Sequence, residues 1–286
     1  MTVTNRMGLP ESLVRAVETE PHNKDGSLSA TTLLKGAKQI LLERRHWEEL
    51  EDDACDRVWA AFGTAVHRLL EEKNPDAFTE ESFEVKVSKT KVTGRVDLYE
   101  MDKACVTDYK TASVWKVIYR TFDDWRRQGL TYAWLMRKSG LEVDKCRFVA
   151  LLRDWSATEA GRRADYPQAP AFVYEFKVDE AGLSEIEAFV KEKVALVETS
   201  EPLADDDIPP CSPEERWERP TTWAVMKEGR KTALRVFDAK EEADKMADGQ
   251  KGLSVEERKG ACARCEGYCL AARFCSFAKG LKGGKE

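Results

Sequence analysis

The pattern of apolar and polar residues predicts a series of helices and strands up to residue 200. Alternation of the two kinds of residue is typical of a strand with one buried face, and recurrence at helical spacing is typical of an amphipathic helix. Helices are therefore expected over 33–47, 54–73, 122–139 and 179–200, and strands over 82–87, 93–112 (two strands joined by a turn), 145–153 and 171–178. This order predicts an α/β fold with a mixed central sheet flanked by helices.

Two of the helices carry features that predict their surroundings. Ser29 or Thr31 is the expected N-cap of the helix over 33–47, because a hydroxyl can accept the first backbone N–H groups. Gly63 lies inside the helix over 54–73, which predicts close approach of another backbone. Apolar side chains at helical spacing are expected to face the core from that helix: Trp59, Phe62, Val66, Leu69 and Leu70.

A linker rich in proline and aspartate follows, over residues 201–213. Beyond it the pattern predicts a hairpin over 223–237 that turns at residues 228 and 229, a helix over 239–249 and a strand over 253–258. We therefore expect an N-terminal arm (1–28), a core domain (29–203) and a C-terminal module (204–286), with a small α+β unit inserted at about 217–258.

The composition of the chain bears on its cellular compartment, on the class of protein and on the use of its cysteines. The chain has 286 residues and a formal net charge of -6, and no apolar run is long enough to span a bilayer. The first 20 residues lack an apolar signal core, so a cytoplasmic protein is expected. The acidic balance does not exclude a nuclease, because such a site is built of carboxylates and its basic groove is local. Four of the eight cysteines crowd the C-terminus, which in the cytosol favours metal binding over disulfides.

The two strands over 93–112 carry a candidate metal site. The first contains Asp97, and the second ends in Asp108, Tyr109 and Lys110. Residues two apart on a strand face the same side, so Asp108 and Lys110 point together, and a hairpin can bring Asp97 beside Asp108. Mg²⁺ prefers oxygen ligands, and a lysine can steady a nucleophilic water or a developing negative charge. The three residues Asp97, Asp108 and Lys110 therefore predict a divalent-metal site beside a cationic group.

Four motifs in order resemble those of a known family. They are G-x3-H at 63–67, GRVD at 94–97, DYK at 108–110 and Q-x3-Y at 128–132. Together they resemble the RecB-like branch of the PD-(D/E)XK nuclease superfamily, over roughly residues 29 to 200. The likeness is to phage-type RecB-like exonucleases, and more loosely to AddB and to CRISPR-associated RecB-like nucleases. It implies a restriction-endonuclease-like core and a Mg²⁺- or Mn²⁺-dependent DNA exonuclease of recombination, repair or phage DNA processing.

The resemblance also implies roles for the residues of the hairpin. Asp97 and Asp108 would bind the divalent ion, His67 would be a further ligand, and the Tyr109 carbonyl would contribute to the same site. Lys110 would position the attacking water or stabilise the charge that develops on the phosphate. Asp108 stands where many members have glutamate, and the superfamily pattern accepts either residue.

Further residues would support this site. Gln128 and Tyr132 would orient the DNA backbone or the catalytic residues, and Glu71, one turn beyond His67, would support the metal ligands from outside. DNA contacts are expected from basic residues of the first motif strand and of the helix over 122–139: Arg95, Arg126 and Arg127.

The C-terminal cysteines extend the resemblance to iron–sulfur members. One upstream cysteine and three near the C-terminus would hold a [4Fe-4S] cluster: Cys211, Cys265, Cys269 and Cys275. Cys262 is the alternate ligand, since a local set of 262, 265, 269 and 275 is also feasible. Four thiolates could equally hold Zn²⁺, and spacing alone does not decide between the two metals.

Two rival interpretations stay open beside the exonuclease. The chain could be a catalytically idle nucleic-acid-binding subunit of a larger DNA-processing complex, or a cysteine-ligated protein in which the D-x-K pattern is coincidental. The sequence contains no helicase P-loop, so any unwinding must come from a partner such as a helicase or recombination protein. Strand polarity, strand preference and oligomeric state do not follow from the sequence.

Overall fold

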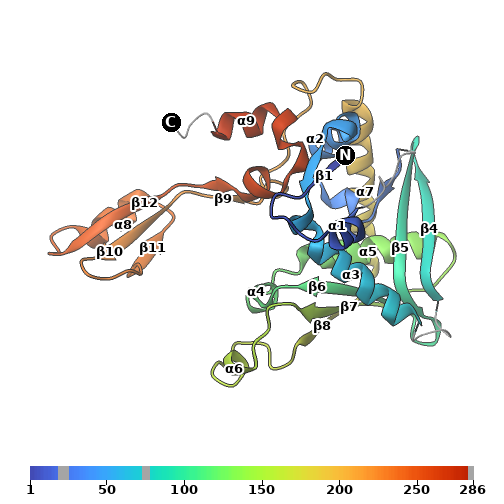
Figure 1. Cartoon of the computed structure of the whole chain (residues 1–286), viewed down its shortest axis with the longest axis horizontal. Coiled ribbons are helices and arrows are strands. Elements are labelled where there is room, and N and C mark those ends of the chain that lie inside the picture. Colours follow the sequence, from blue (N-terminus) through green and yellow to red (C-terminus); the bar gives the residue numbers. More distant parts are fainter. Residues whose placement is uncertain (19–25, 73–77, 283–286) are drawn as a thin grey trace. The chain divides into compact units, whose positions relative to one another are not determined.

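Residues 1–18, 26–72 and 78–282 are described by a computed structural model of the chain, whose elements Figure 1 labels. At residues 71, 72, 78 and 282 the described structure covers the backbone and leaves out the side chains. The chain forms two units, Met1–Leu203 and Ala204–Glu286. No helix in the described part of the chain is long and apolar enough to cross a membrane.

The first unit is built on a six-stranded mixed sheet, as the sequence predicts. Its strands run in the order β2-β5-β6-β7-β8, and β4 pairs with β5 outside this path. The pairs β2–β5 and β6–β7 are parallel, and the pairs β4–β5, β5–β6 and β7–β8 are antiparallel. The strands are β2 (Leu28–Ser29), β4 (Phe78–Val87), β5 (Thr90–Glu100), β6 (Cys105–Ala112), β7 (Lys145–Leu152) and β8 (Ala171–Lys177).

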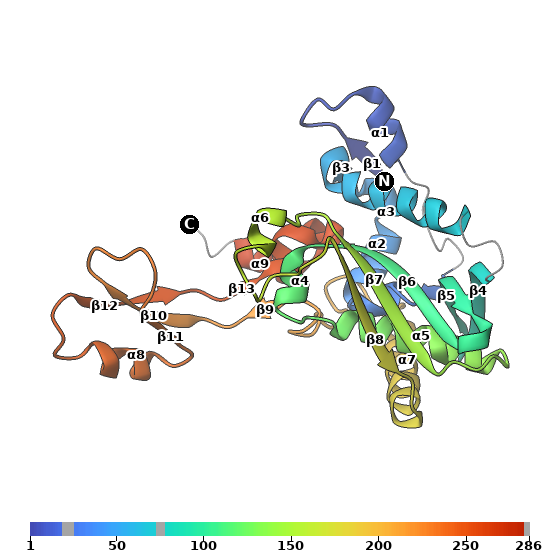
Figure 2. The ribbon, with the colours of Figure 1, turned by 90° about the horizontal axis from the view of Figure 1, so that it is seen from below.

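Helices cover both faces of this sheet, so the unit has an α/β layer architecture. Figure 2 shows α3 on one face, and α5 with α7 on the other. The parallel pair β6–β7 is joined by a crossover through α4 and α5, because parallel strands need such a long connection. The helices are α2 (Ala37–Arg45), α3 (Ala54–Glu72), α4 (Val114–Ile118), α5 (Asp123–Lys138), α6 (Ala157–Ala160) and α7 (Glu180–Ser200), with 3-10 turns at Thr32–Leu34, Trp47–Glu49 and Met101–Lys103.

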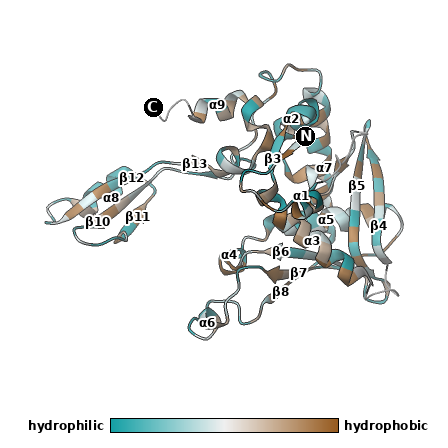
Figure 3. Cartoon of the chain, in the orientation of Figure 1, coloured by the Kyte–Doolittle hydropathy of each residue, from teal (hydrophilic) through white to brown (hydrophobic). Residues whose placement is uncertain are grey.

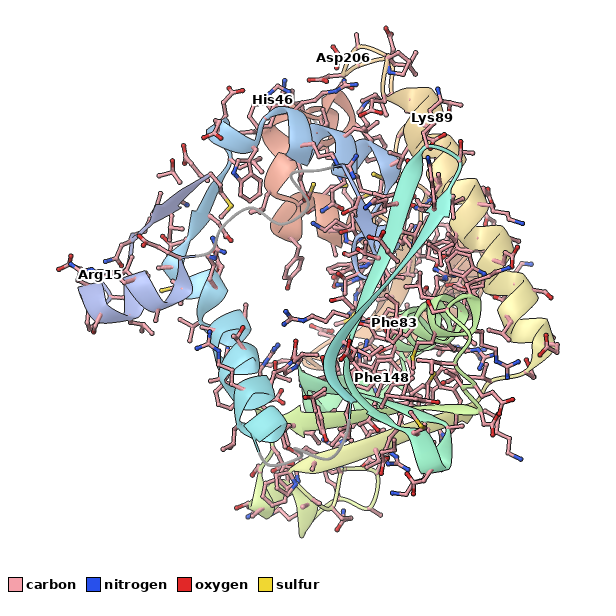
Figure 4. The ribbon with its side chains drawn as sticks, turned by 90° about the vertical axis from the view of Figure 1, so that its right-hand side faces the viewer. Arg15, His46, Phe83, Lys89, Phe148 and Asp206 are labelled. Carbon is pink, nitrogen blue, oxygen red and sulfur yellow. The ribbon has the colours of Figure 1, made fainter. Side chains whose placement is uncertain are left out.

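The core between the sheet and α5 is aromatic. Alternate residues of β7 are buried, among them Phe148, whose ring stacks on Trp125 of α5 at a centroid distance of 5.6 Å. Figure 4 labels Phe148 in this layer. Gly129 of α5 sits against the same ring, since a Cβ there would lie 3.0 Å from Phe148 and from Phe176. The missing side chain at Gly129 therefore lets α5 approach the sheet closely.

The N-terminal residues differ from the expected arm. Thr2–Thr4 (β1) pairs in parallel with Glu51–Asp53 (β3), and Glu11–Val17 forms helix α1, which contacts α3. Asp53 accepts hydrogen bonds from the Thr4 hydroxyl and the Arg6 backbone N–H, which hold the start of the chain beside α3. These are long-range contacts, which residue pattern alone does not reveal.

Two expectations for the helices are wrong in detail. The Ser29 hydroxyl accepts from the backbone N–H of Thr32 and so closes a short 3-10 turn, while α2 begins only after Gly36. On α3 three large apolar side chains lie exposed instead of in the core: Trp59, Phe62 and Leu69. The side of α3 that faces the sheet is the one with Gly63 and His67, so the apolar stripe is rotated away from it.

The second unit contains the predicted hairpin and helix. Strands β10 (Thr222–Lys227) and β11 (Arg235–Phe237) are antiparallel, and β12 (Leu253–Arg258) pairs with the other edge of β10. Gly229 in the hairpin turn has a φ of +79°, which favours glycine. The remaining elements are β9 (Glu218–Arg219), α8 (Lys240–Ala247), β13 (Ala261–Cys262), a π-helix (Arg264–Tyr268), a 3-10 helix (Leu270–Phe274) and α9 (Ser276–Lys282).

Glu187 of α7 links this helix to α5. Its contacts allow a test of how the stability of the fold depends on pH. Its carboxylate pairs with Lys191 at 2.7 Å and with Lys138 of α5 at 3.1 Å, and accepts from the indole of Trp134 at 3.0 Å. These partners, Lys191 first, lower the pKa of Glu187 from 4.5 to about 2. A lowered pKa stabilises the fold above the unfolded value, and this stabilisation is lost as the pH falls towards the folded pKa.

We expect Glu187→Gln to lower the melting temperature by about 2–4 °C at pH 7, for a loss of about 1 kcal/mol. The difference from wild type should shrink as the pH falls from about 4.5 towards about 2, where both forms carry a neutral side chain. Thermal denaturation followed by circular dichroism at pH 7 and pH 3 measures this, with the exposed Glu185→Gln as the matched control. A larger difference at pH 3 than at pH 7 would contradict the assignment.

Candidate active site

The hairpin of β5 and β6 opens at the residues that the sequence singled out. The backbone pairing of the two strands ends at Leu98 and Thr107. Beyond this pair, the side chain of Asp97 makes the contact between the strands. Oδ2 of Asp97 accepts the backbone N–H of Tyr109 at 2.7 Å. Asp97 therefore lies beside the end of β6, as predicted, and its carboxylate is fixed by the strand that carries Asp108 and Lys110.

His67 reaches this point from α3. Its Nε2 donates to the carbonyl oxygen of Tyr109 at 2.9 Å, and its Nδ1 lies 3.4 Å from Oδ1 of Asp97. Because a carbonyl only accepts, Nε2 carries the proton and Nδ1 is the nitrogen that can bind a metal. The hydrogen bond with Asp97 is the main cause that raises the pKa of His67, against the opposing effect of burial. Gly63 has ordinary space, since a Cβ would lie 3.7 Å from Thr111, so the expected close backbone approach is absent there.

Glu80 is a third potential ligand that sequence reasoning missed. One oxygen of Glu80, one of Asp97 and a ring nitrogen of His67 lie within 4.8 Å of one another. Glu80 has a φ of +54°, and the β4–β5 register steps over it, from Thr79 with Leu98 to Glu81 with Val96. The register is the same on both sides of Glu80, so Glu80 stands directly opposite Asp97, and its carboxylate also pairs with Arg95. The only signal in the sequence is the break in alternation made by two consecutive glutamates.

The buried Asp108 and the half-buried Lys110 form an ion pair next to these three residues. Oδ2 of Asp108 lies 2.7 Å from Nζ of Lys110, as their shared strand face predicts. Burial raises the pKa of Asp108 to about 6; the Lys110 ammonium opposes this, and the charge of Asp97 adds to it. A cation held near Asp97 and Asp108 would therefore relieve a real electrostatic conflict between two carboxylates.

Gln128 and Tyr132 of α5 hold Asp108 in place. The Gln128 amide donates to Oδ1 of Asp108 at 3.2 Å and to the Tyr132 hydroxyl at 2.7 Å. All three side chains are buried. Gln128 and Tyr132 can thus orient the carboxylate of Asp108. Because both side chains are buried, they cannot contact a DNA backbone.

Gly94 of β5 makes room for this arrangement and gives a direct test of it. A Cβ at Gly94 would lie 2.6 Å from Leu135 and 3.0 Å from the ring of Tyr132. We expect Gly94→Ala to cost about 1–3 kcal/mol of stability by overpacking and to displace Tyr132. Thermal melts should show this loss, whereas Gly161→Ala, where a Cβ meets its nearest atom at 3.6 Å, should show none. Wild-type behaviour of Gly94→Ala would refute the tight contact.

Arg126 and Arg127, two of the predicted DNA contacts, do not lie at this site. The Arg126 guanidinium lies 5.1 Å from the ring of Phe176 on β8, and that of Arg127 lies 4.9 Å from the ring of Phe189 on α7. Both side chains therefore pack on the face of the sheet that α5 and α7 cover, opposite the face that α3 covers. The side chain of Glu71 lies outside the described part of the chain.

Comparison with known proteins gives distant likenesses only. No protein-family profile and no curated protein matches the chain. Among solved structures it is similar to SSO0001, at 20% identity over 65% of this chain and 85% of that one, with a TM-score of 0.44. It is similar to the alkaline exonuclease LHK-Exo of Laribacter hongkongensis (14% identity, 62% and 90% covered, TM-score 0.40) and to a phage related exonuclease of Haemophilus somnus 129PT (12%, 66% and 94%, 0.36). Likenesses of this degree do not assign an activity.

A second group of candidate ligands lies in the C-terminal unit. Cys262 is buried, and Cys211, Cys265, Cys269 and Cys275 are half-buried. Burial raises the pKa of Cys265 to about 11, and the neighbouring thiols of Cys262, Cys211 and Cys275 add to the shift. The distant Cys211 is thus brought to the terminal cysteines. Pairing of β9 with β13 accounts for this, since it sets Glu218 opposite Cys262.

Proposed function

We propose that the protein is a metal-dependent nuclease that hydrolyses phosphodiester bonds of DNA, as a RecB-like exonuclease of the PD-(D/E)XK superfamily. The observation that carries the proposal is the convergence of His67, Glu80 and Asp97 beside the Asp108–Lys110 pair. A nitrogen, several carboxylate oxygens and one ammonium form a set that suits a divalent ion next to a phosphate.

The ion in this proposal is Mg²⁺ or Mn²⁺. His67 through Nδ1, Glu80 and Asp97 would hold it, with Asp108 as the fourth ligand. The fit is supported by the distance of at most 4.8 Å among the first three ligand atoms, and by the mutual repulsion of Asp97 and Asp108. The Tyr109 carbonyl accepts the His67 proton, so we assign it the task of orienting that ring in place of metal binding.

The ion, when bound, would lower the pKa of a water molecule and polarise the scissile phosphate. Lys110 would stabilise the negative charge that builds on the phosphate, from a position fixed by its pairing with Asp108. Gln128 and Tyr132 would keep Asp108 oriented towards both groups. Arg95, already beside Glu80 and largely exposed, is the one residue of the predicted DNA-contact set that we retain next to the site.

We further propose that the C-terminal cysteines hold a [4Fe-4S] cluster with a structural role, in the manner of iron–sulfur members of the superfamily. Cys211, Cys265 and Cys275 belong to the ligand set that the sequence implies. We take Cys262, the buried member of the group, as the fourth ligand, with Cys269 as the alternative. Thiolates are the ligands that such a cluster requires, and Zn²⁺ is the alternative that metal analysis separates.

Digestion of DNA labelled at the 5′ or the 3′ end, in single- and double-stranded form and over a titration of Mn²⁺, tests the proposed activity. We expect hydrolysis that depends on the metal and releases short products from an end. Binding of DNA without hydrolysis under every metal condition would instead point to an idle subunit and refute the proposal. A DNA circle of the same sequence distinguishes end-dependent from internal cleavage.

A further inference from the structure

Two exposed aromatic rings follow directly on the strand that carries Asp108 and Lys110. Trp115 and Tyr119 of α4 are 46% and 68% exposed, and their rings stack with a centroid distance of 5.7 Å and an angle of 23°. Figure 3 shows hydrophobic residues along α4. Stacked rings of this size are usually covered in a folded domain, so their exposure marks a surface with a function.

A second aromatic pair lies on α3, the helix that carries His67. Trp59 and Phe62 are 47% and 45% exposed, and their rings meet edge to face at 6.1 Å. Trp59 precedes His67 by eight residues, or about 12 Å along the helix. The four rings of Trp59, Phe62, Trp115 and Tyr119 are called the aromatic strip below.

Arginines lie on both halves of the aromatic strip. The Arg153 guanidinium is 5.4 Å from the centre of Trp59, and that of Arg163 is 5.9 Å from the centre of Trp115. Arg153 is exposed, while Arg163 also pairs with Asp165 at 2.7 Å. The aromatic strip thus combines flat π faces with cationic groups, the combination that suits unstacked bases on a phosphate backbone.

The loop after β7 fixes the two halves relative to each other. The backbone N–H of Arg153 donates to the carbonyl of Ala112 at the end of β6. The Asp154 carboxylate accepts from the Ser113 hydroxyl at 2.7 Å and from the Val114 N–H at 2.8 Å, at the start of α4. The rings on α4 are therefore held at a set position beside the strand that leads back to Lys110.

We propose that the aromatic strip binds single-stranded DNA by base stacking and leads the strand to the site at Asp97 and Lys110. The inference rests on the proposed nuclease function for the identity of the ligand, and it adds the substrate class. A duplex keeps its base faces covered, so stacking on these rings requires a single strand or a frayed end. Stacking accepts every base, so binding by the aromatic strip is independent of sequence.

The test is a binding measurement that needs no catalysis. Fluorescence anisotropy with a labelled oligothymidylate, in EDTA, compares wild type with Trp115→Ala and Tyr119→Ala. We expect each alanine variant to bind about 10-fold or more weakly, since one stacked base is lost. Trp115→Phe and Tyr119→Phe keep a ring and should bind within about 2-fold of wild type. Met101→Ala, an exposed apolar side chain elsewhere in the same unit, is the matched control.

An abasic oligonucleotide of equal length and charge makes the readout specific to stacking. Wild type should bind it more weakly than it binds oligothymidylate, and the alanine variants should bind it with the same affinity as wild type does. Equal affinity of wild type and variants for oligothymidylate would overturn the proposal, and so would an equal loss for both oligonucleotides.

Other occupants of the aromatic strip give different results. A change of oligomeric state in Trp115→Ala, with DNA affinity unchanged, would show that a second copy covers the rings and would also overturn the proposal. Wild type that binds the strand through these rings and yet never hydrolyses it would refute the proposed activity alone, so the two failures are distinguishable.

Discussion

Replacing Lys110 by methionine should slow DNA hydrolysis by about 10²–10³-fold, the usual cost of removing one group that stabilises charge in a transition state. Methionine keeps a similar stem beside Phe148, whose ring centre lies 5.8 Å from the ammonium. The substitution also removes the cation that opposes protonation of Asp108. Initial rates with end-labelled DNA in Mn²⁺ measure the loss, and circular dichroism verifies the fold.

Two matched variants separate loss of the charge from loss of the metal. Asp97→Asn should lose hydrolysis together with Mn²⁺ binding, measured by calorimetry, because an amide is a poorer ligand than a carboxylate. Lys110→Met should keep Mn²⁺ binding. Lys103→Ala, which removes an exposed lysine paired with Glu100, should leave both quantities unchanged. A Lys110→Met protein that digests DNA at the wild-type rate would remove the basis of the proposed mechanism.

Replacing Cys262 or Cys265 by serine should strip the metal from the C-terminal unit. Protein purified without oxygen should be brown with iron bound, and either variant should be colourless. Structural metal sites can contribute about 10 kcal/mol to folding, so hydrogen exchange over 204–286 should rise steeply in both variants. Cys55→Ser, in the first unit, should keep the colour and the exchange pattern.

Cys269→Ser distinguishes the two ligand sets. If Cys262 is the fourth ligand, Cys269→Ser should retain most of its iron. Loss of iron from Cys269→Ser with retention in Cys262→Ser would restore the set that the sequence alone implies. Colourless wild-type protein with stoichiometric zinc would overturn the iron–sulfur assignment and leave the cysteine set to be tested with zinc.

Local pattern was sufficient for most of the first unit's elements. The apolar run over 145–153 predicts the strand that the structure has as β7, and the periodicity over 179–200 predicts the helix that it has as α7. The placement of Asp97 beside the Asp108–Lys110 strand followed from the two-residue period and a short turn. These features depend on neighbours in sequence, which is why they could be predicted.

The features that escaped prediction depend on distant partners. Glu80 enters the site because the pairing of β4 with β5 sets it opposite Asp97, and that pairing does not follow from the residue pattern of β4 alone. The apolar residues of α3 were expected in the core, but the choice of which side faces the sheet is made by Gly63 and His67. Arg126 and Arg127 resemble DNA contacts by charge alone, while the aromatic rings of Phe176 and Phe189 decide where they lie.

The short ladder between β9 and β13 has an evolutionary consequence. It places Arg219 directly opposite Ala261, so everything from residue 222 to 258 leaves and returns at adjacent backbone positions. A segment with neighbouring ends can be shortened, enlarged or exchanged for a tight turn while β9 and the cysteine-bearing β13 stay in register. We therefore expect changes in the length of the three-stranded subdomain with α8 to leave the backbone around Cys262 intact.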